Sequence, residues 1–133
     1  MELFWEKIRN RLNRLSQPVG NPQGCIVFRG QITREGEGYG IMKVKWPGYE
    51  TFKVEKAHRM AYMLHNRLTY TMIPRINEKG EPLECSHICH MSICINPTHI
   101  VLETHSSNLG RMTCKVHGVC HNGNHSDPPC LLI

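Results

Sequence analysis

Cysteine and histidine recur at short intervals in the second half of this chain. The segment from residue 85 to 99 reads CSHICHMSICINPTH and places Cys89, Cys94 and His99 five residues apart. Thiolates and imidazoles bind tetrahedral zinc, and a loop with this spacing can supply three corners of the tetrahedron. A catalytic zinc would keep water in the fourth corner. We favour a structural zinc with Cys25 as fourth ligand, because it is the only cysteine outside the C-terminal half.

A second group of ligands lies in the tail from residue 114 to 130, which reads CKVHGVCHNGNHSDPPC and has few apolar residues with which to fold. These ligands predict another structural zinc site. Its thiolates are Cys114, Cys120 and Cys130. Its fourth ligand is His125, His121 or His117; we prefer His125, but the spacing leaves the choice open. Two such sites use six of the seven cysteines and leave Cys85 free, although Cys85 is close enough to Cys89 to replace a ligand of the first site.

Two further polar residues are not explained by zinc. His87 precedes the first zinc loop, and Asn108 falls in a helix that Thr104 or Ser106 can cap and that runs through Met112, after a short strand over residues 100–103. Strand, loop, strand and helix form a ββα unit. A neutral imidazole can deprotonate water, and an amide oxygen can help to hold Mg²⁺ at a phosphate. Their joint placement predicts phosphodiester hydrolysis, with His87 as general base and Asn108 as Mg²⁺ ligand.

The elements upstream must position this unit. Apolar periodicity predicts a helix over residues 3–15, with Phe4, Ile8, Leu12 and Leu15 on one stripe, and a helix from residue 55 to about 66. Between them, strands over residues 25–29, 38–46 and 50–55 are expected to form an antiparallel meander. Alternation puts apolar side chains on one face of it, namely Met42, Val44, Trp46, Phe52 and Val54, and lysines on the other. The fold class is therefore α+β.

Length and charge limit the possibilities further. A chain of 133 residues predicts a single domain: residues 1–20 form a helix and connector, 24–70 the sheet and its covering helix, 83–113 the ββα unit, and 114–133 the zinc-binding tail. Residues 1–75 hold 13 Lys and Arg against 6 Asp and Glu, whereas residues 76–133 hold 3 against 5. This split suits a nucleic-acid partner, although a solvated basic face without a partner explains it nearly as well.

The cysteines also bear on the compartment. Their number is odd, and the charged N-terminus lacks the apolar core of a signal peptide, so zinc is preferred to disulfides and a reducing, intracellular location is expected, nuclear if the source is eukaryotic. No stretch approaches the roughly 20 apolar residues that a membrane span needs.

The residues SHICHMSICINPTHI, the later SSNLGRMTC and the Cys/His tail resemble the His-Cys box homing endonucleases of the His-Me finger (ββα-metal) superfamily. The resemblance is strongest over residues 85–130 and looser over 25–66, where GCIVFRG, GYG and AHRMAY are similar to small HNH-type nucleases. It implies a DNA endonuclease with two structural zinc ions, one catalytic Mg²⁺, and an antiparallel sheet that enters the major groove of double-stranded DNA.

The resemblance also implies roles for individual residues. His87 would be the general base and Asn108 the Mg²⁺ ligand. The first zinc site would be Cys25, Cys89, Cys94 and His99, and the second Cys114, Cys120, His125 and Cys130. Arg59 is the candidate for the basic residue at the scissile phosphate, with Arg111 in reserve. The residues expected to contact DNA are Lys43, Lys45, Lys53, Gln31 and Arg34.

Two alternatives accompany this assignment. A zinc-stapled module that binds DNA without cutting it, similar to the DNA-binding domains of Smad transcription factors, would have the same scaffold but no need for His87 and Asn108; we therefore prefer the nuclease. Related homing enzymes are dimers that exchange C-terminal tails. This chain stops three residues after Cys130, so any homodimer is expected to form elsewhere, for example through the N-terminal helix.

Overall fold

The computed structural model describes residues 2–132. Its α-helices are α1 (Glu2–Arg14), α2 (Ala57–Asn66) and α3 (His105–His117), and its short 3₁₀ helices are η1 (Pro97–His99) and η2 (Asn122–Asn124). The strands are β1 (Ser16–Pro18), β2 (Ile26–Phe28), β3 (Ile41–Val44), β4 (Lys53–Lys56), β5 (Leu83–His87) and β6 (Ile100–Thr104). They form three antiparallel pairs, β1–β2, β3–β4 and β5–β6. The predicted α+β class is confirmed, and no helix within residues 2–132 is long and apolar enough to cross a bilayer.

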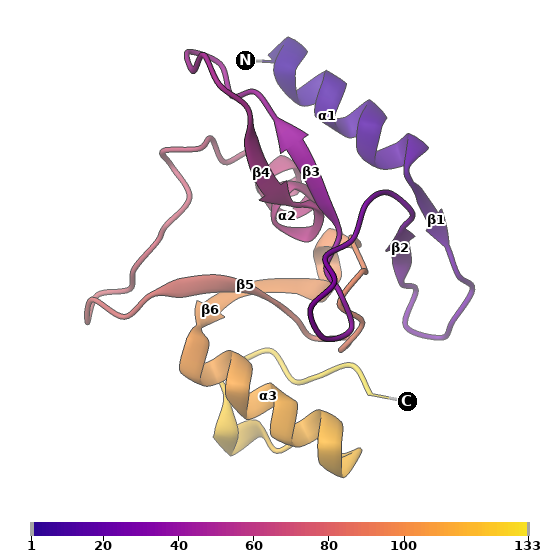
Figure 1. The fold of residues 1–133 in the computed structure, drawn as a ribbon. Coiled ribbons are helices and arrows are strands. Elements are labelled where there is room, and N and C mark those ends of the chain that lie inside the picture. Colours follow the sequence, from indigo (N-terminus) through magenta and orange to yellow (C-terminus); the bar gives the residue numbers. More distant parts are fainter. Residues whose placement is uncertain (1, 133) are drawn as a thin grey trace.

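The N-terminal helix packs by its predicted apolar stripe. Ile8 and Leu12 are buried in a core that also contains Met60 and Met63 of α2. At the other end of the stripe, the Phe4 ring lies 5.1 Å from the ring of Trp46, just after β3. Figure 1 shows the result: α1 and α2 lie beside the β3–β4 hairpin, and the β5–β6 hairpin separates this part from α3.

The β3–β4 hairpin differs from the prediction in one strand. Met42, Val44 and Trp46 are buried as expected, but the placement of Phe52 and Val54 on the same apolar face is wrong, since they are 65% and 63% exposed. The register pairs Val44 with Lys53 and Lys43 with Val54. Because partners across a ladder share a face and neighbours alternate, this register exchanges the two faces of β4.

The predicted three-strand meander is also wrong. β2 pairs with β1, which lies in the segment expected to be a connector. On the other side of β2, the N–H of Phe28 donates to the carbonyl of Ile93, and the N–H of Ile95 donates to that of Ile26. The zinc loop thus occupies the strand edge at which the next strand was expected, because its backbone satisfies the same hydrogen-bonding groups.

The ββα unit is present as predicted. β5 and β6 pair from Leu83–Thr104 to His87–Ile100. The hydroxyl of Thr104 caps α3 by accepting the N–H of Ser107. The helix continues beyond Met112 to His117 and is capped by Gly118, whose φ of 71° suits a residue without a side chain. Cys114 therefore lies on the last turns of α3, not at the start of a separate tail.

Candidate functional site

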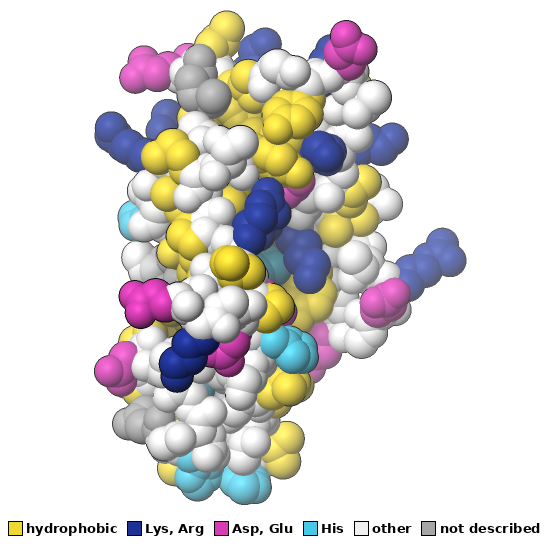
Figure 2. Space-filling model, turned by 90° about the vertical axis from the view of Figure 1, so that its left-hand side faces the viewer, with side chains coloured by type: hydrophobic (Ala, Val, Ile, Leu, Met, Phe, Trp, Pro, Cys, Tyr) yellow, Lys and Arg dark blue, Asp and Glu magenta, His cyan; other side chains and the backbone are white. Residues whose placement is uncertain are grey.

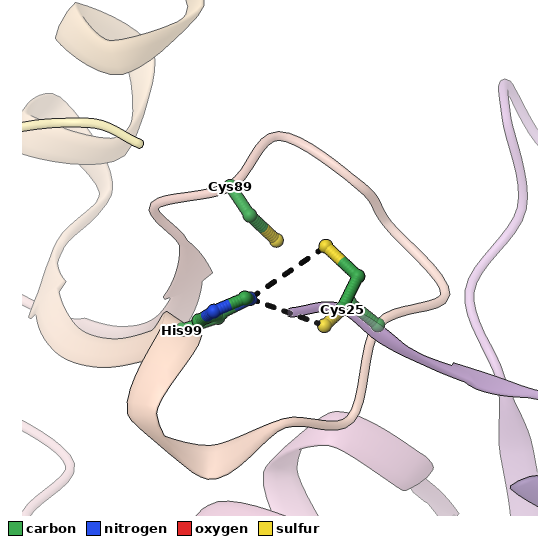
Figure 3. Close-up of side chains that lie close together, drawn as sticks. Cys25, Cys89 and His99 are labelled. Atoms are coloured by element: carbon green, nitrogen blue, oxygen red, sulfur yellow. Dashed lines mark hydrogen bonds between the residues drawn. The ribbon is translucent and has the colours of Figure 1, made fainter. Parts of the chain in front are cut away.

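The first predicted zinc cluster assembles from three parts of the chain. The donor atoms of Cys25, Cys89, Cys94 and His99 all lie within 4.8 Å of one another. Nδ1 of His99 is 3.6 Å from Sγ of Cys25 and 3.6 Å from Sγ of Cys94. Zinc bonds of about 2.3 Å to sulfur and 2.0 Å to nitrogen at tetrahedral angles imply a separation of about 3.5 Å. The cluster is therefore compatible with structural zinc, and Figure 3 shows Cys25, Cys89 and His99 directed toward a common point.

Local structure brings these ligands together. Cys25 is held just before β2 by its N–H, which donates to the side chain of Asn21. His99 ends the turn η1, which the Asn96 side chain caps. A hydrogen bond between the two thiols lowers the pKa of Cys94 and raises the pKa of Cys89, as expected for two closely paired thiols that share one proton.

The second cluster consists of Cys114, Cys120, His125 and Cys130, again within 4.8 Å. Nε2 of His125 lies 3.4 Å from Sγ of Cys120 and 3.6 Å from Sγ of Cys130. Its Nδ1–H donates to the carbonyl of Ser126, which leaves the Nε2 lone pair for a metal. The other two candidates, His117 and His121, contact each other, with Nδ1 of His117 3.0 Å from Nε2 of His121. Among the open alternatives, the structure thus places His125 in the site.

Cys85 lies in neither cluster. It is on β5, where burial raises the pKa of its thiol to about 11. The two Cys3His clusters account for the other six cysteines.

His87 has the hydrogen bond that a general base needs. Its Nε2 lies 2.8 Å from the carbonyl oxygen of Cys94. A carbonyl only accepts, so Nε2 carries the proton and the Nδ1 lone pair is available. Burial lowers the pKa of His87, which keeps the imidazole neutral at pH 7, the form able to take a proton.

His58 is a neighbour of His87 that the sequence reasoning missed. The two rings are 4.3 Å apart, and the ring of Tyr39 lies 5.5 Å from that of His58. His58 is 3% exposed, and its Nε2–H donates to the carbonyl of Cys85. The available signal was its position three residues before buried Ala61, which places both on the same helical face.

Asn108 lies near both histidines and lines two pockets with them. An open pocket of about 430 Å³ is lined by His87 and Asn108 together, and a second of about 410 Å³ by His58, Arg59 and Asn108. Nδ2 of Asn108 donates to Oε1 of Glu84 at 2.7 Å, which leaves its oxygen for another partner. An amide oxygen is among the hard ligands that Mg²⁺ accepts, together with water and substrate phosphates. The residues present fit that ion.

A comparison with protein-family models gives one match. The model described as the zinc-binding loop region of homing endonuclease matches residues 24–132. The chain belongs to this family. The matched region contains all eight residues of the two Cys/His clusters as well as His87 and Asn108. Neither the comparison with curated proteins nor that with solved structures gave a match.

In this homing-endonuclease-family chain, the two candidate arginines have different surroundings. Arg59 lines the second pocket, and its Nε lies 3.8 Å from Oε2 of Glu55. Arg111 is 1% exposed and makes two hydrogen bonds with the carboxylate of Glu103, at 2.6 and 2.9 Å. It also donates to the Ser126 carbonyl and to Sγ of Cys130. Arg111 thus links α3 to the second cluster and also lines the pocket that contains His87, whereas Arg59 lines the adjoining pocket.

The residues expected to contact DNA do not share one face. Lys43, Lys45, Gln31 and Arg34 are exposed. Lys53 lies across from buried Val44, with Nζ 5.5 Å from the ring centre of Tyr70. The exposed face of the hairpin carries Lys56 in its place, paired with Ile41. Figure 2 shows Lys and Arg side chains gathered in the middle of one face, next to histidine and acidic side chains.

Proposed function

We propose that this protein is a divalent-metal-dependent endonuclease that hydrolyses phosphodiester bonds of double-stranded DNA. The observation that carries the proposal is the hydrogen bond from His87 Nε2 to the Cys94 carbonyl, 2.8 Å long, in a pocket that Asn108 also lines. It presents a neutral imidazole with its Nδ1 lone pair available beside an amide oxygen suited to Mg²⁺. The family match to homing endonucleases supports the same reaction.

In this proposal, His87 removes a proton from water through Nδ1 as the water oxygen attacks phosphorus. The bond from phosphorus to the 3′ oxygen breaks, and the leaving oxygen takes a proton from solvent. Mg²⁺ bound at the Asn108 oxygen would supply positive charge at the scissile phosphate and the leaving oxygen. Arg59 would add a fixed positive charge from the adjoining pocket.

The two Cys/His clusters have a structural role in this proposal. Cys94 supplies both a ligand of the first cluster and the carbonyl that orients His87. The geometry of the base therefore depends on the folded zinc loop. Arg111 connects the second cluster to α3, the helix that carries Asn108.

The test is nicking of supercoiled plasmid by the zinc-loaded protein in Mg²⁺. His87→Ala should reduce the rate about 10²- to 10⁴-fold, as expected for loss of a general base, and EDTA should abolish cleavage. His117→Ala, at the exposed end of α3, is the matched control and should cleave normally. The ratio of nicked to linear product reports whether one copy or a homodimer acts.

A protein that binds duplex DNA but does not cut it, with any divalent metal tried, would contradict the endonuclease. The DNA-binding module similar to those of Smad proteins would then be the better account. Cleavage that His87→Ala leaves unchanged would contradict the assignment of the base.

A further inference from the structure

Two side chains of α3 converge on the carboxylate of Glu84, near the start of β5. Oε1 of Glu84 accepts from Nδ2 of Asn108 at 2.7 Å and lies 3.0 Å from Nδ1 of His105. Both are adjacent to the pocket that contains Arg59. Neither Glu84 nor His105 has a part in the reaction proposed above.

The register of the β5–β6 hairpin explains why Glu84 reaches α3. Glu84 pairs with Glu103, so the two carboxylates lie on one face of the hairpin. Each carboxylate binds side chains of the helix packed there: Glu103 accepts from Arg111, and Glu84 accepts from Asn108 and also contacts His105. Asn108 and Arg111 are three apart and so lie on the same side of α3.

The bond to Glu84 decides which atom of Asn108 is available. An ionised carboxylate only accepts hydrogen bonds, so the amide must turn its NH₂ toward Glu84. If the Asn108 amide were turned by 180°, its oxygen would lie about as close to the Glu84 carboxylate oxygen as Nδ2 does now, and the two oxygens would repel each other. Oδ1 of Asn108 is therefore left for a cation, and the hydrogen bond to a charged group polarises the amide toward that oxygen.

We infer that Glu84 is a positioning residue for Asn108: its carboxylate holds the amide in the one orientation that presents Oδ1 to a divalent cation. This inference rests on the proposed function. It explains why the Glu84 carboxylate, which is 39% exposed, lies beside Asn108, the proposed cation ligand.

The test compares Glu84→Ala with Glu84→Gln. Glutamine keeps an oxygen that can accept from Nδ2 of Asn108, whereas alanine removes it. Loss of a partner that orients a metal ligand weakens metal affinity about 10- to 100-fold. We expect Glu84→Ala to need a Mg²⁺ concentration higher by that factor for half-maximal nicking. Glu84→Gln should need a concentration close to that of the parent protein. His105→Ala, which removes the other partner of the same carboxylate, should leave the Mg²⁺ requirement unchanged.

A second readout does not depend on cleavage. Mn²⁺ binding to the protein with a short DNA duplex, measured by electron paramagnetic resonance in a His87→Ala background, should weaken by a similar factor for Glu84→Ala and not for Glu84→Gln. Zinc content and thermal unfolding of each variant show whether it is folded.

The outcomes separate this inference from the proposed function. Unchanged Mg²⁺ and Mn²⁺ requirements in Glu84→Ala would overturn the inference and leave the nuclease intact. An equal loss of metal affinity in Glu84→Ala and Glu84→Gln would mean that the carboxylate itself binds the ion, which would also overturn the inference. If the parent protein cuts no DNA, the proposed function fails, while Mn²⁺ binding still tests Glu84. If it also binds no Mn²⁺, both fail.

Discussion

Arg111 and Glu103 form a buried ion pair that should be costly to break. The Arg111 guanidinium and the Glu103 carboxylate are 1% and 2% exposed and share two hydrogen bonds. Removing one member leaves the other charged and unpaired, which costs about 3–5 kcal/mol in buried pairs. We therefore expect Arg111→Met to lower the free energy of unfolding by that amount at fixed zinc, measured with urea.

The control for Arg111 is the exposed pair between Lys115 and Glu37, whose nitrogen and oxygen are 2.7 Å apart. Solvent screens this pair, so Lys115→Met should cost less than about 1 kcal/mol. Similar losses in the two variants would contradict the role assigned to burial.

His58 predicts a dependence of stability on pH. Burial, and then the neighbouring His87, lower its pKa well below the ordinary value. The folded protein keeps this imidazole neutral, while the unfolded chain binds a proton near pH 6.5, so the free energy of unfolding falls as pH drops below about 6.5. One such group contributes up to about 1.4 kcal/mol per pH unit.

The slope of the unfolding free energy with pH is proportional to the number of protons taken up on unfolding. Replacing His58 by Gln should lower that number by up to about one as pH falls from 6.5 to 5, measured by urea unfolding at several pH values. His65→Gln on the exposed side of the same helix is the matched control, since both variants lose one histidine. An equal reduction in the two variants would show that the slope does not come from the buried ring.

Among the elements, α3 and the tail approach so closely that a glycine is required between them. A Cβ built at Gly110 would lie 1.7 Å from the backbone oxygen of Asn124. Alanine at a free helical position would stabilise the helix, but here the backbone would have to move. Gly110→Ala should therefore cost about 1–3 kcal/mol and loosen zinc in the second cluster, measured by thermal unfolding and by zinc release to a chelator.

Gly123→Ala is the comparison for Gly110, because a Cβ at Gly123 meets nothing within 4 Å. This variant should unfold like the parent. If Gly110→Ala were equally stable, the close packing of the tail against α3 would be wrong.

The β3–β4 hairpin divides the lysines by face, and this division predicts their effects on DNA binding. Lys43 and Lys45 are exposed, whereas Lys53 faces the rings of Tyr49 and Tyr70. If the exposed face meets phosphates, Lys43→Ala and Lys45→Ala should each weaken binding of every duplex and reduce the salt slope by about one. Lys53→Ala should change the slope less. Fluorescence anisotropy at several salt concentrations measures this, and an effect of Lys53 as large as that of Lys43 would refute it.

For the molecule as a whole, the two Cys/His clusters predict two zinc ions per chain. Ligands from before β2, from the loop after β5 and from η1 meet in the first cluster, so its loss should disorder the loop that orients His87. Cys25→Ser should contain about one zinc and lose nicking activity, whereas Cys85→Ser should keep two. Elemental analysis of the purified variants checks both numbers; two zinc ions in Cys25→Ser would show that another residue replaces Cys25.

Most members of the two Cys/His clusters could be predicted from the sequence because they lie within a few residues of one another; the catalytic roles of His87 and Asn108 stay predictions. Five-residue intervals and a ββα pattern predict which side chains belong together before any contact is known. The helices were predicted for a similar reason: the stripe of α1 and the cap of α3 at Thr104 depend on residues within a few turns of each other.

Tertiary structure decided what depends on pairing between distant segments. The pairing of β2 with β1 and the zinc loop, and the faces of β4, follow from which backbone groups compete for one strand edge and in which register. The same holds for His125 in the second cluster, for the burial of His58 and for the hydrogen bond from Asn108 to Glu84. Loop closure and packing bring these residues to their partners, and the spacing in the sequence does not predict those contacts.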